Sequence, residues 1–291
     1  MMNSFLADLR RRKIHGVPVT GTRHAICRGA ARRSRNITSA LRISLASWIV
    51  SAAAAQAQWT AVSSESDFSS GKAVEHRHVV ARSASGDEAT LDVALFSWKR
   101  VTLRVIDIPA ADTSMEAVMQ REDAIAGVNG GYFDPQYAPV GLLVSRGRVI
   151  APQQKARLLS GVVSVVNGRV QVQRAAEFSV KTKPTAARQC GPFLVEAGKA
   201  MPGLNNSRRA RRTFVLTMSG ERAAIGFCSH VTLAELAALL VTPQVIASGK
   251  VQRALNLDGG SSSGFWFAGE RRPFSIPEQK TVRDFLAIVP R

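Results

Sequence analysis

Short runs of alternating apolar and polar residues, separated by turns, constrain the fold of this chain more than any other feature. Residues 90–96 and 101–108 alternate with the period of two that is typical of strands. Asn167-Gly168 joins predicted strands at 160–166 and 169–173 and is the strongest short hairpin signal. The other predicted strands are 124–128, 141–144, 148–150, 193–195, 213–218, 223–228, 255–258 and 285–289. This pattern predicts a largely antiparallel multi-stranded sheet.

Two segments have the period of a helix instead. Residues 114–121 predict a short helix capped by Thr113 or Asp112. Residues 232–240 predict a second helix, because Thr232 and Glu235 form a capping-box pattern and leucines recur at helical spacing before Pro243. The sequence contains no internal repeat and no long linker. We therefore predict an α+β fold, a single domain with two or three helices packed on the sheet.

Much of the net charge of +18 belongs to the N-terminal part of the chain. Residues 1–57 hold ten of the 39 Lys and Arg residues and one of the 21 Asp and Glu residues, so half of the excess lies there. The remaining charges of both signs are interspersed, and no nucleic-acid-binding motif is present. We therefore expect no nucleic-acid partner.

The same N-terminal part has the features of an export signal. Its basic stretch is followed by apolar residues 41–55, fewer than the about 20 residues that a bilayer-spanning helix needs. Ala55-Gln56-Ala57 then matches the small-x-small pattern of a signal-peptidase site. Residues 1–57 are predicted to be a basic leader and signal peptide. The mature chain would be periplasmic or extracellular, without stable membrane insertion. A buried helix is the alternative interpretation of the apolar stretch.

The mature chain divides into an exposed segment and a domain. Residues 58–89 are rich in serine and other polar residues and predict an exposed segment with one edge strand at 74–82, ahead of a domain at 90–291. Because Cys27 would leave with the leader, Cys190 and Cys228 would remain. In an oxidising compartment these two would form a disulfide or stay as buried thiols. The sequence leaves this open, and it does not indicate an oligomeric state.

Two places in the chain share one form, in which an apolar run is followed by a polar residue and two glycines. They are Asn129-Gly130-Gly131 and Asp258-Gly259-Gly260, the second continuing into Ser261-Ser262. Paired glycines after a strand let the backbone approach a ligand closely or adopt positive φ. Each motif alone is consistent with an ordinary turn. Together they suggest a site at which polar side chains project from the ends of two strands.

The wider series of motifs resembles the phosphodiester glycosidase family over about residues 90–290. The segments that carry the resemblance are, in order, 128–134, 141–147, 189–195, 211–213, 232–237 and 255–262. One departure is that Gly259-Gly260 runs directly into serines, where the family often has an additional glycine. The resemblance implies a hydrolase that attacks an anomeric carbon and releases a phosphate ester, without identifying the sugar.

This chemistry places limited demands on the protein. Ordinary glycosidases need two carboxyl groups, one of which protonates a poor alkoxide leaving group. A phosphate monoester is a stable anion that needs little protonation, so one carboxylate and a set of phosphate-binding donors would suffice. We expect Asp258 to be the carboxylate, acting as nucleophile or as base for water. The alternative is that Asp258 forms a turn by bonding its own backbone.

Substrate-binding groups are expected around this carboxylate. Arg212 is the leading phosphate ligand, because a guanidinium can grip two phosphate oxygens. Asn129 would contact the sugar or orient Asp258. Backbone amides and hydroxyls would supply further donors to phosphate or sugar oxygens, and the expected contributors are Gly130, Gly131, Gly259, Gly260, Ser261 and Ser262.

Other polar residues are expected to have structural roles. The arginines near Arg212, namely Arg208, Arg209 and Arg211, are predicted to lie on a solvated loop, and the capping box accounts for Glu235. His76 and His78 alternate on the predicted edge strand and are expected to be exposed rather than metal ligands, while His230, just before the Thr232 cap, is placed to approach the cleft. No metal-ligand spacing is present. We expect no required cofactor, and although Asp134 is near Asn129, a divalent cation is unsupported.

Three classes of function remain open. The first is an exported phosphodiester glycosidase. The second is a binding module of the same fold that holds a cell-surface glycan without cleaving it. The third is a protein of spore or envelope assembly, for which Asn129 and Asp258 would matter only to the fold. Only the enzyme requires an ionised Asp258 at the anomeric carbon.

Overall fold

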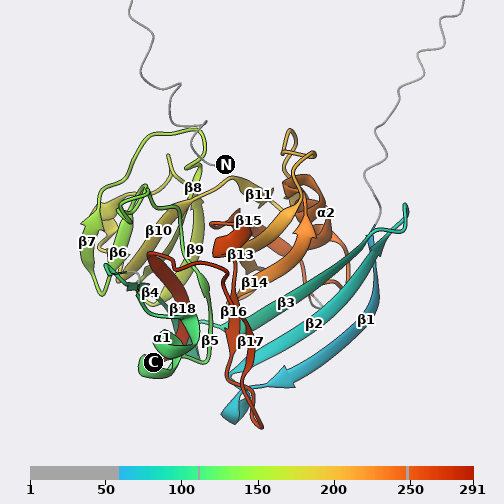
Figure 1. Cartoon of the computed structure of the whole chain (residues 1–291). Helices are drawn as coiled ribbons and strands as arrows, with labels where there is room; N and C mark the ends of the chain where they lie inside the picture. The colour runs from blue at the N-terminus through green and yellow to red at the C-terminus, as the bar shows by residue number, and fades with distance from the viewer. Residues whose placement is uncertain (1–58, 111, 247–248) are drawn as a thin grey trace, which may run out of the picture. The chain divides into compact units, whose positions relative to one another are not determined.

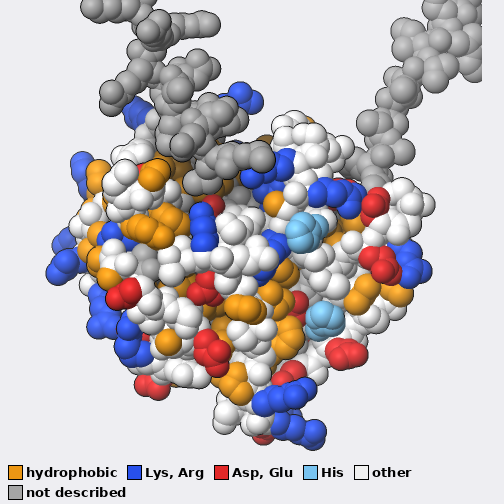
Figure 2. Space-filling model, in the orientation of Figure 1, with side chains coloured by type: hydrophobic (Ala, Val, Ile, Leu, Met, Phe, Trp, Pro, Cys, Tyr) orange, Lys and Arg blue, Asp and Glu red, His pale blue; other side chains and the backbone are white. Residues whose placement is uncertain are grey.

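The computed structural model describes residues 59–291 except residues 111 and 247–248. The predicted leader, signal peptide and cleavage site lie outside these residues. In the described part, no helix is long and apolar enough to span a bilayer. Figure 2 shows Lys and Arg side chains spread over several parts of one face and interspersed with acidic ones.

Three sheets make up the described chain, and every strand pairing within them is antiparallel (Figure 1). The eight-stranded sheet has the order β1 (Trp59–Phe68), β2 (Val74–Ser83), β3 (Glu88–Ser97), β14 (Arg222–Val231), β13 (Ala210–Met218), β15 (Val251–Asn256), β11 (Phe193–Glu196) and β12 (Lys199–Ala200). One five-stranded sheet has the order β7 (Arg148–Ala151), β6 (Leu143–Ser145), β10 (Ala186–Cys190), β8 (Gly161–Val166) and β9 (Arg169–Arg174). The other has the order β17 (Phe274–Ile276), β16 (Phe265–Phe267), β5 (Ala126–Asn129), β18 (Asp284–Pro290) and β4 (Val101–Asp107).

Two α-helices, α1 (Met115–Arg121) and α2 (Leu233–Val241), complete the fold together with the short 3-10 turns η2 (Ser70–Lys72), η3 (Val180–Thr182) and η4 (Gly260–Ser262). The predicted capping box of α2 is present, with Thr232 and Glu235 satisfying each other's backbone N–H groups. The N-cap of α1 is Ser114, whose hydroxyl accepts from Ala117 N, rather than the predicted Thr113 or Asp112. The β-rich α+β prediction is confirmed.

The main core lies where the three sheets meet. It contains Phe227 and Leu255 from the eight-stranded sheet, Val163 from the second sheet, and Val128 and Leu286 from the third. A second core forms on the other face of the eight-stranded sheet, where leucines of α2 cover it. Burial of apolar surface on both faces explains why the central strands read as nearly continuous apolar runs.

Residues 59–89 differ from the expectation of an exposed segment. They form β1 and β2, and Val74, Val79 and Ala81 of β2 are fully buried. Only β1, at the edge of the sheet, is largely exposed. The polar composition of this segment reflects the outward face of the edge strand, and the strand content of the chain is accordingly higher than predicted.

A fully buried ion pair links the second and third sheets. Arg188 on β10 donates from Nε to both carboxylate oxygens of Asp284 on β18, at 3.0 and 3.1 Å, and both side chains are completely shielded from solvent. The remaining guanidinium nitrogens donate to the carbonyl oxygens of Tyr132, Val140, Leu142 and Gln189. A buried charge is tolerable only when it is paired and hydrogen-bonded in this way.

We predict that Arg188→Met destabilises the protein by about 3–5 kcal/mol, because it leaves the Asp284 carboxylate buried without a partner. Urea unfolding followed by circular dichroism measures this. Arg82→Met is the matched control, since Arg82 pairs with Glu88 at the surface and such pairs contribute about 0–1 kcal/mol. Equal losses from the two variants would contradict a special role for the buried pair.

Candidate functional site

The two glycine motifs meet in space, as the sequence suggested. Asn129 at the end of β5 donates from Nδ2 to the main-chain oxygen of Asp258 at 2.8 Å, and Asp258 N donates to the oxygen of Gly130 at 3.1 Å. Thr213 on β13 donates from its hydroxyl to the same Asp258 oxygen at 2.7 Å. Two strands from two sheets, β5 and β13, therefore hold the backbone of Asp258 in one position.

The glycines at 130 and 131 are required by packing against the buried ion pair. A Cβ atom on Gly130 would lie 1.8 Å from Oδ1 of Asp284, and one on Gly131 would lie 2.5 Å from the guanidinium carbon of Arg188. The Gly131 amide also donates to Oδ1 of Asp284 at 3.2 Å. The backbone at these glycines therefore makes the predicted close approach to the buried ion pair of the protein itself.

Different physical reasons favour glycine at positions 259 and 260. Gly260 has a φ of +68°, a left-handed conformation that costs glycine little. A Cβ on Gly259 would lie 3.2 Å from the oxygen of Arg211 and 3.5 Å from Nη1 of Arg212. Gly259 therefore separates the Asp258 backbone from the guanidinium of Arg212 with no side chain between them.

Arg212 is a buried residue of β13 whose guanidinium is held on one side only. Nε donates to the oxygen of Val231 at 3.1 Å, and Nη2 donates to the oxygen of Arg208 at 2.7 Å. Within the described residues, Nη1 makes no hydrogen bond and is the nitrogen that faces Gly259. Burial lowers the pKa of Arg212 from its ordinary value, with the positive charge of Arg208 acting in the same direction.

The carboxyl group of Asp258 is partly shielded from solvent. Its Oδ1 accepts from the Gly259 amide at 2.9 Å. Burial raises the pKa of Asp258, whereas the Ser262 hydroxyl, the positive charge of Lys280 and the Gly259 amide all act to lower it. The group is thus held near cationic and donor groups in an environment that disfavours its charged form.

The two serines of the motif separate. Ser261 is exposed, whereas Ser262 is fully buried in η4. The Ser262 hydroxyl is close enough to lower the pKa of Asp258, although no contact meets the full geometry of a hydrogen bond among the described residues. Of these two hydroxyls, only that of Ser261 is open to solvent.

Tyr132 and Asn256 also belong to this cluster, although the sequence did not single them out. The Tyr132 hydroxyl donates to the main-chain oxygen of Gly191 at 2.5 Å, and Asn256 Nδ2 donates to that oxygen at 3.0 Å and to the Tyr132 hydroxyl oxygen at 3.4 Å. Burial, and then the neighbouring Cys190 and Asp258, raise the pKa of Tyr132 well above its ordinary value. A polar residue inside the apolar run before Asp258 was the one signal that pointed to Asn256.

Several other expectations are corrected or refined by the contacts. Arg211 is not on a solvated loop, because its guanidinium lies 5.1 Å from the centre of the Phe227 ring and donates to the oxygens of Ser263 and Pro277. Arg209 pairs with Glu235 and Asp87. Asp134 caps a turn, accepting from the amides of Gln136 and Ala138. His230 is exposed at the end of β14.

The two histidines of β2 also depart from the prediction. His76 is buried rather than exposed, and its Nε2 lies 3.0 Å from Oδ1 of Asp92. His78 is partly exposed, and its Nδ1 lies 2.9 Å from the same oxygen. The inward position of His76 follows from its register on β2, which is an internal strand of the sheet. Among the described residues, no group of histidine, cysteine, aspartate and glutamate side chains has the arrangement of a metal site.

Cys190 and Cys228 are both buried and are not bonded to each other. Burial raises the pKa of Cys190 to about 12 and also raises that of Cys228. Both thiols therefore stay protonated at neutral pH and behave as small apolar side chains, which is the second of the two alternatives.

Comparisons with known proteins agree with the fold and the motifs. The family model described as phosphodiester glycosidase matches residues 122–289. The catalytic domain of zebrafish N-acetylglucosamine-1-phosphodiester alpha-N-acetylglucosaminidase, auto-inhibited by its pro-peptide, superposes with a TM-score of 0.60 at 14% identity, covering 79% of this chain and 88% of that one. A hypothetical protein from Synechocystis gives a TM-score of 0.51 at 13% identity, covering 75% and 62%.

At these identities the structural matches establish a shared fold, and no curated protein sequence matches the chain significantly. The family model, in contrast, matches more than half of the chain and includes both glycine motifs. The chain belongs to the phosphodiester glycosidase family.

Proposed function

We propose that this protein is an exported hydrolase that cleaves a sugar 1-phosphodiester, with Asp258 as the nucleophile or base and Arg212 as a phosphate ligand. The observation that carries the proposal is that Gly259, the residue next to Asp258, adjoins Nη1 of Arg212 with no side chain between them, while the other two nitrogens of that guanidinium are already hydrogen-bonded. The family of the chain supports the same substrate class.

The two groups divide the chemistry between them. Asp258 attacks the anomeric carbon or removes a proton from the attacking water, and the bond from that carbon to the phosphate oxygen breaks with its electron pair going to the phosphate. Nη1 of Arg212, the nitrogen without a partner in the described chain, donates to a phosphate oxygen. Asn129 and Thr213 fix the Asp258 backbone, so the carboxylate needs little reorganisation.

Further donors are proposed to come from the same loop. Ser261 is exposed and its hydroxyl is free to reach a sugar or phosphate oxygen, as are the amides of Gly260 and Ser261. Gly130, Gly131 and Ser262 have structural roles in this proposal. Gly130 and Gly131 pack on the buried ion pair, and Ser262 is fully buried. No metal ion or other cofactor has a part in this proposal.

We predict that Asp258→Asn abolishes turnover while sparing binding, because the amide keeps the shape and the bond to the Gly259 amide but cannot act as nucleophile or base. The measurement is release of free sugar from a panel of α-linked sugar 1-phosphodiesters, with calorimetric binding of the same compounds in parallel. Undiminished turnover by Asp258→Asn would rule out this role.

Two arginine variants serve as a matched pair in the same assay. Arg212→Gln should weaken binding of the phosphodiester about tenfold to a hundredfold, the range expected for loss of a charged hydrogen bond. Arg209→Gln should have little effect, because Arg209 is committed to Glu235 and Asp87. Similar losses in both variants would point to general electrostatic attraction instead of a specific phosphate ligand.

The raised pKa of Asp258 predicts a pH-dependent cost in stability. A carboxyl group whose pKa is higher in the folded than in the unfolded state destabilises the fold as pH rises through that folded pKa. We therefore expect Asp258→Asn to have a higher melting temperature than wild type at pH 7. The difference should vanish below about pH 4, the ordinary range of an aspartate.

Glu177→Gln is the control of opposite sign, because the hydrogen bond from Arg253 lowers the pKa of Glu177 and its charge therefore stabilises the fold above its ordinary range. Differential scanning calorimetry from pH 3 to pH 8 measures both variants. A melting temperature of Asp258→Asn equal to or below that of wild type at pH 7 would contradict the proposed cost.

One observation favours a second candidate, a non-catalytic glycan-binding or envelope-assembly protein. Oδ1 of Asp258 accepts from the adjacent Gly259 amide, as an aspartate that merely forms a turn would do. In that case Asp258→Asn would leave glycan binding intact, and the wild type would release no sugar from any member of the panel. The turnover assay therefore decides between the two candidates.

We propose export on the strength of the sequence of residues 1–57, with its basic leader, short apolar run and small-x-small site. Expression in a bacterial host should give a secreted or periplasmic protein that begins at Gln58. N-terminal sequencing of the mature protein checks this, and a cytoplasmic protein that retains the leader would contradict it.

A further inference from the structure

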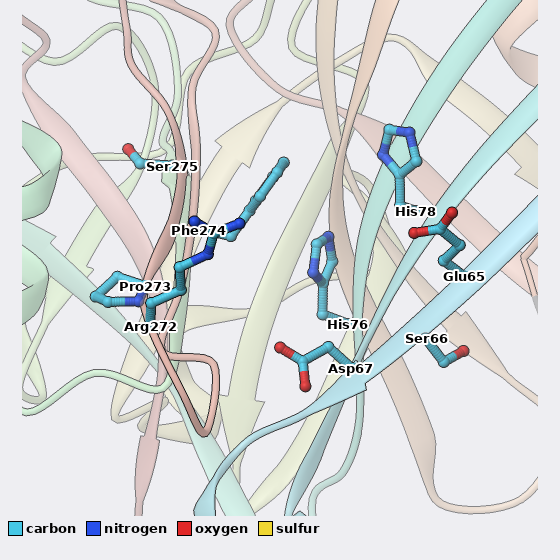
Figure 3. Close-up of a pocket in the computed structure, with 9 residues that line it drawn as sticks. All are labelled: Glu65, Ser66, Asp67, His76, His78, Arg272, Pro273, Phe274 and Ser275. Carbon is cyan, nitrogen blue, oxygen red and sulfur yellow. The ribbon is translucent and has the colours of Figure 1, made fainter.

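A hollow of about 500 Å³ lies beside the eight-stranded sheet, away from the cluster around Asp258. One wall comes from β1 and β2, with Glu65, Asp67, His76 and His78, and the other from the segment that leads into β17, with Arg272 and Phe274. Figure 3 shows the two groups of side chains on opposite sides of the opening. Nothing in the proposed reaction uses these residues.

The histidine wall of this hollow is preorganised. Asp92 is almost completely buried, and one of its oxygens contacts a ring nitrogen of each histidine, at 3.0 and 2.9 Å. The ring of His76 also packs against Phe265, Phe267 and Phe274, with centroids 4.8 to 5.2 Å apart. The two imidazoles are therefore fixed before any ligand arrives, and in the neutral form each keeps its second nitrogen as an acceptor.

The charges on the walls select against ionic ligands. Glu65 and Asp67 would repel an anion, and Arg272 would repel a cation. An uncharged ligand rich in hydroxyl groups can both donate to the carboxylates and imidazoles and accept from the guanidinium. The faces of Phe274 and Pro273 offer apolar surface for C–H groups. A neutral sugar has this combination of properties, and few precisely placed polar groups beside apolar surface are typical of small-molecule sites.

The hollow and Asp258 lie at opposite ends of one cross-strand row of the sheet, in which Asp92 and Phe227 are buried. Glu65, His78, Asp92, Phe227 and Thr213 are consecutive cross-strand partners on β1, β2, β3, β14 and β13. Cross-strand partners point to the same face, so these side chains lie in line. Thr213 is the last residue of the row, and its hydroxyl donates to the main-chain oxygen of Asp258. His78 and Thr213 are three strand spacings apart, about 14 Å at about 4.8 Å per spacing.

We propose that this hollow is a binding site for a neutral sugar unit of an extended substrate, so that the phosphodiester cleaved at Asp258 belongs to an oligosaccharide or polysaccharide. The inference rests on the proposed function for the position of the cleaved bond. The sugar unit in the hollow lies along the sheet from the reacting phosphodiester, and its hydroxyls contact Glu65, His78 and Arg272 while its apolar face lies on Phe274.

Binding of neutral oligosaccharides tests the site directly. Hexamers of β-1,4-linked N-acetylglucosamine, β-1,3-linked glucose and α-1,4-linked mannose are titrated into the mature protein and followed by calorimetry. We expect wild type to bind at least one hexamer, and His78→Ala and Arg272→Ala each to weaken that binding about tenfold, as loss of a hydrogen bond of about 1.4 kcal/mol would do. Both residues reach solvent, so neither substitution opens the core.

The matched control is Arg82→Ala, an exposed residue of β2 that lies outside the hollow and pairs with Glu88. It should bind like wild type. The proposal is overturned if no hexamer binds to wild type, or if the two variants of the hollow bind as tightly as Arg82→Ala.

A kinetic arm separates this proposal from the proposed function. With a methyl aglycone, His78→Ala should hydrolyse a sugar 1-phosphodiester like wild type, whereas with a hexasaccharide attached its KM should rise about tenfold at unchanged kcat. Equal KM values of wild type and His78→Ala for the extended compound would overturn the site even if the enzyme is active. Absence of any hydrolysis would instead contradict the proposed function, and the binding titration would still show whether the hollow binds a sugar.

Discussion

The buried ion pair between Arg188 and Asp284 is the interaction on which the rest of the structure depends. It joins β10 to β18 and so holds two of the three sheets together at the level of the candidate site. The pair also determines the sequence next to it, because no residue larger than glycine fits at positions 130 and 131. A buried pair of this kind contributes more to a unique geometry than to net stability, because the free energy lost when both charges leave water offsets much of their mutual attraction.

That geometry reaches Asp258 through the backbone. The Gly130 oxygen accepts from the Asp258 amide, and the Asp258 oxygen accepts from Asn129 and Thr213, so a residue at the end of β15 is fixed by β5 and β13. The side chain of Asp258 remains free to act, apart from its bond to the adjacent amide. Fixing the main chain and leaving the carboxyl group in a partly dry environment is the arrangement expected where a charged group must react.

The same environment explains why such a site lowers the stability of the fold. Burial raises the pKa of Asp258 and lowers that of Arg212, so the fold disfavours both charges that the proposed reaction needs. A phosphodiester would bring its own negative charge beside Arg212, which would restore the balance that burial removes. The histidines of the hollow differ, because Asp92 contacts a ring nitrogen of each and holds both rings in place for an uncharged ligand.

The sequence by itself determined the local elements and the identity of the two glycine motifs. Alternation with period two predicted β3 and β4, Asn167-Gly168 indicated the hairpin of β8 and β9, and the capping box located α2, because each of these signals lies within a few neighbouring residues. The fold class followed from the same patterns, whereas the family was identified from the resemblance of a series of motifs and their order along the chain.

Only the tertiary structure decided which residues those elements bring together. Arg188 and Asp284 are 96 positions apart and each reads alone as a surface charge, so no local pattern could mark them as a buried pair. The same holds for His76, whose burial follows from β2 being an internal strand, and for Arg211, which packs on Phe227 of the next strand. Burial and pairing are properties of contacts between distant segments, and a chain of residues specifies them only through the fold that it forms.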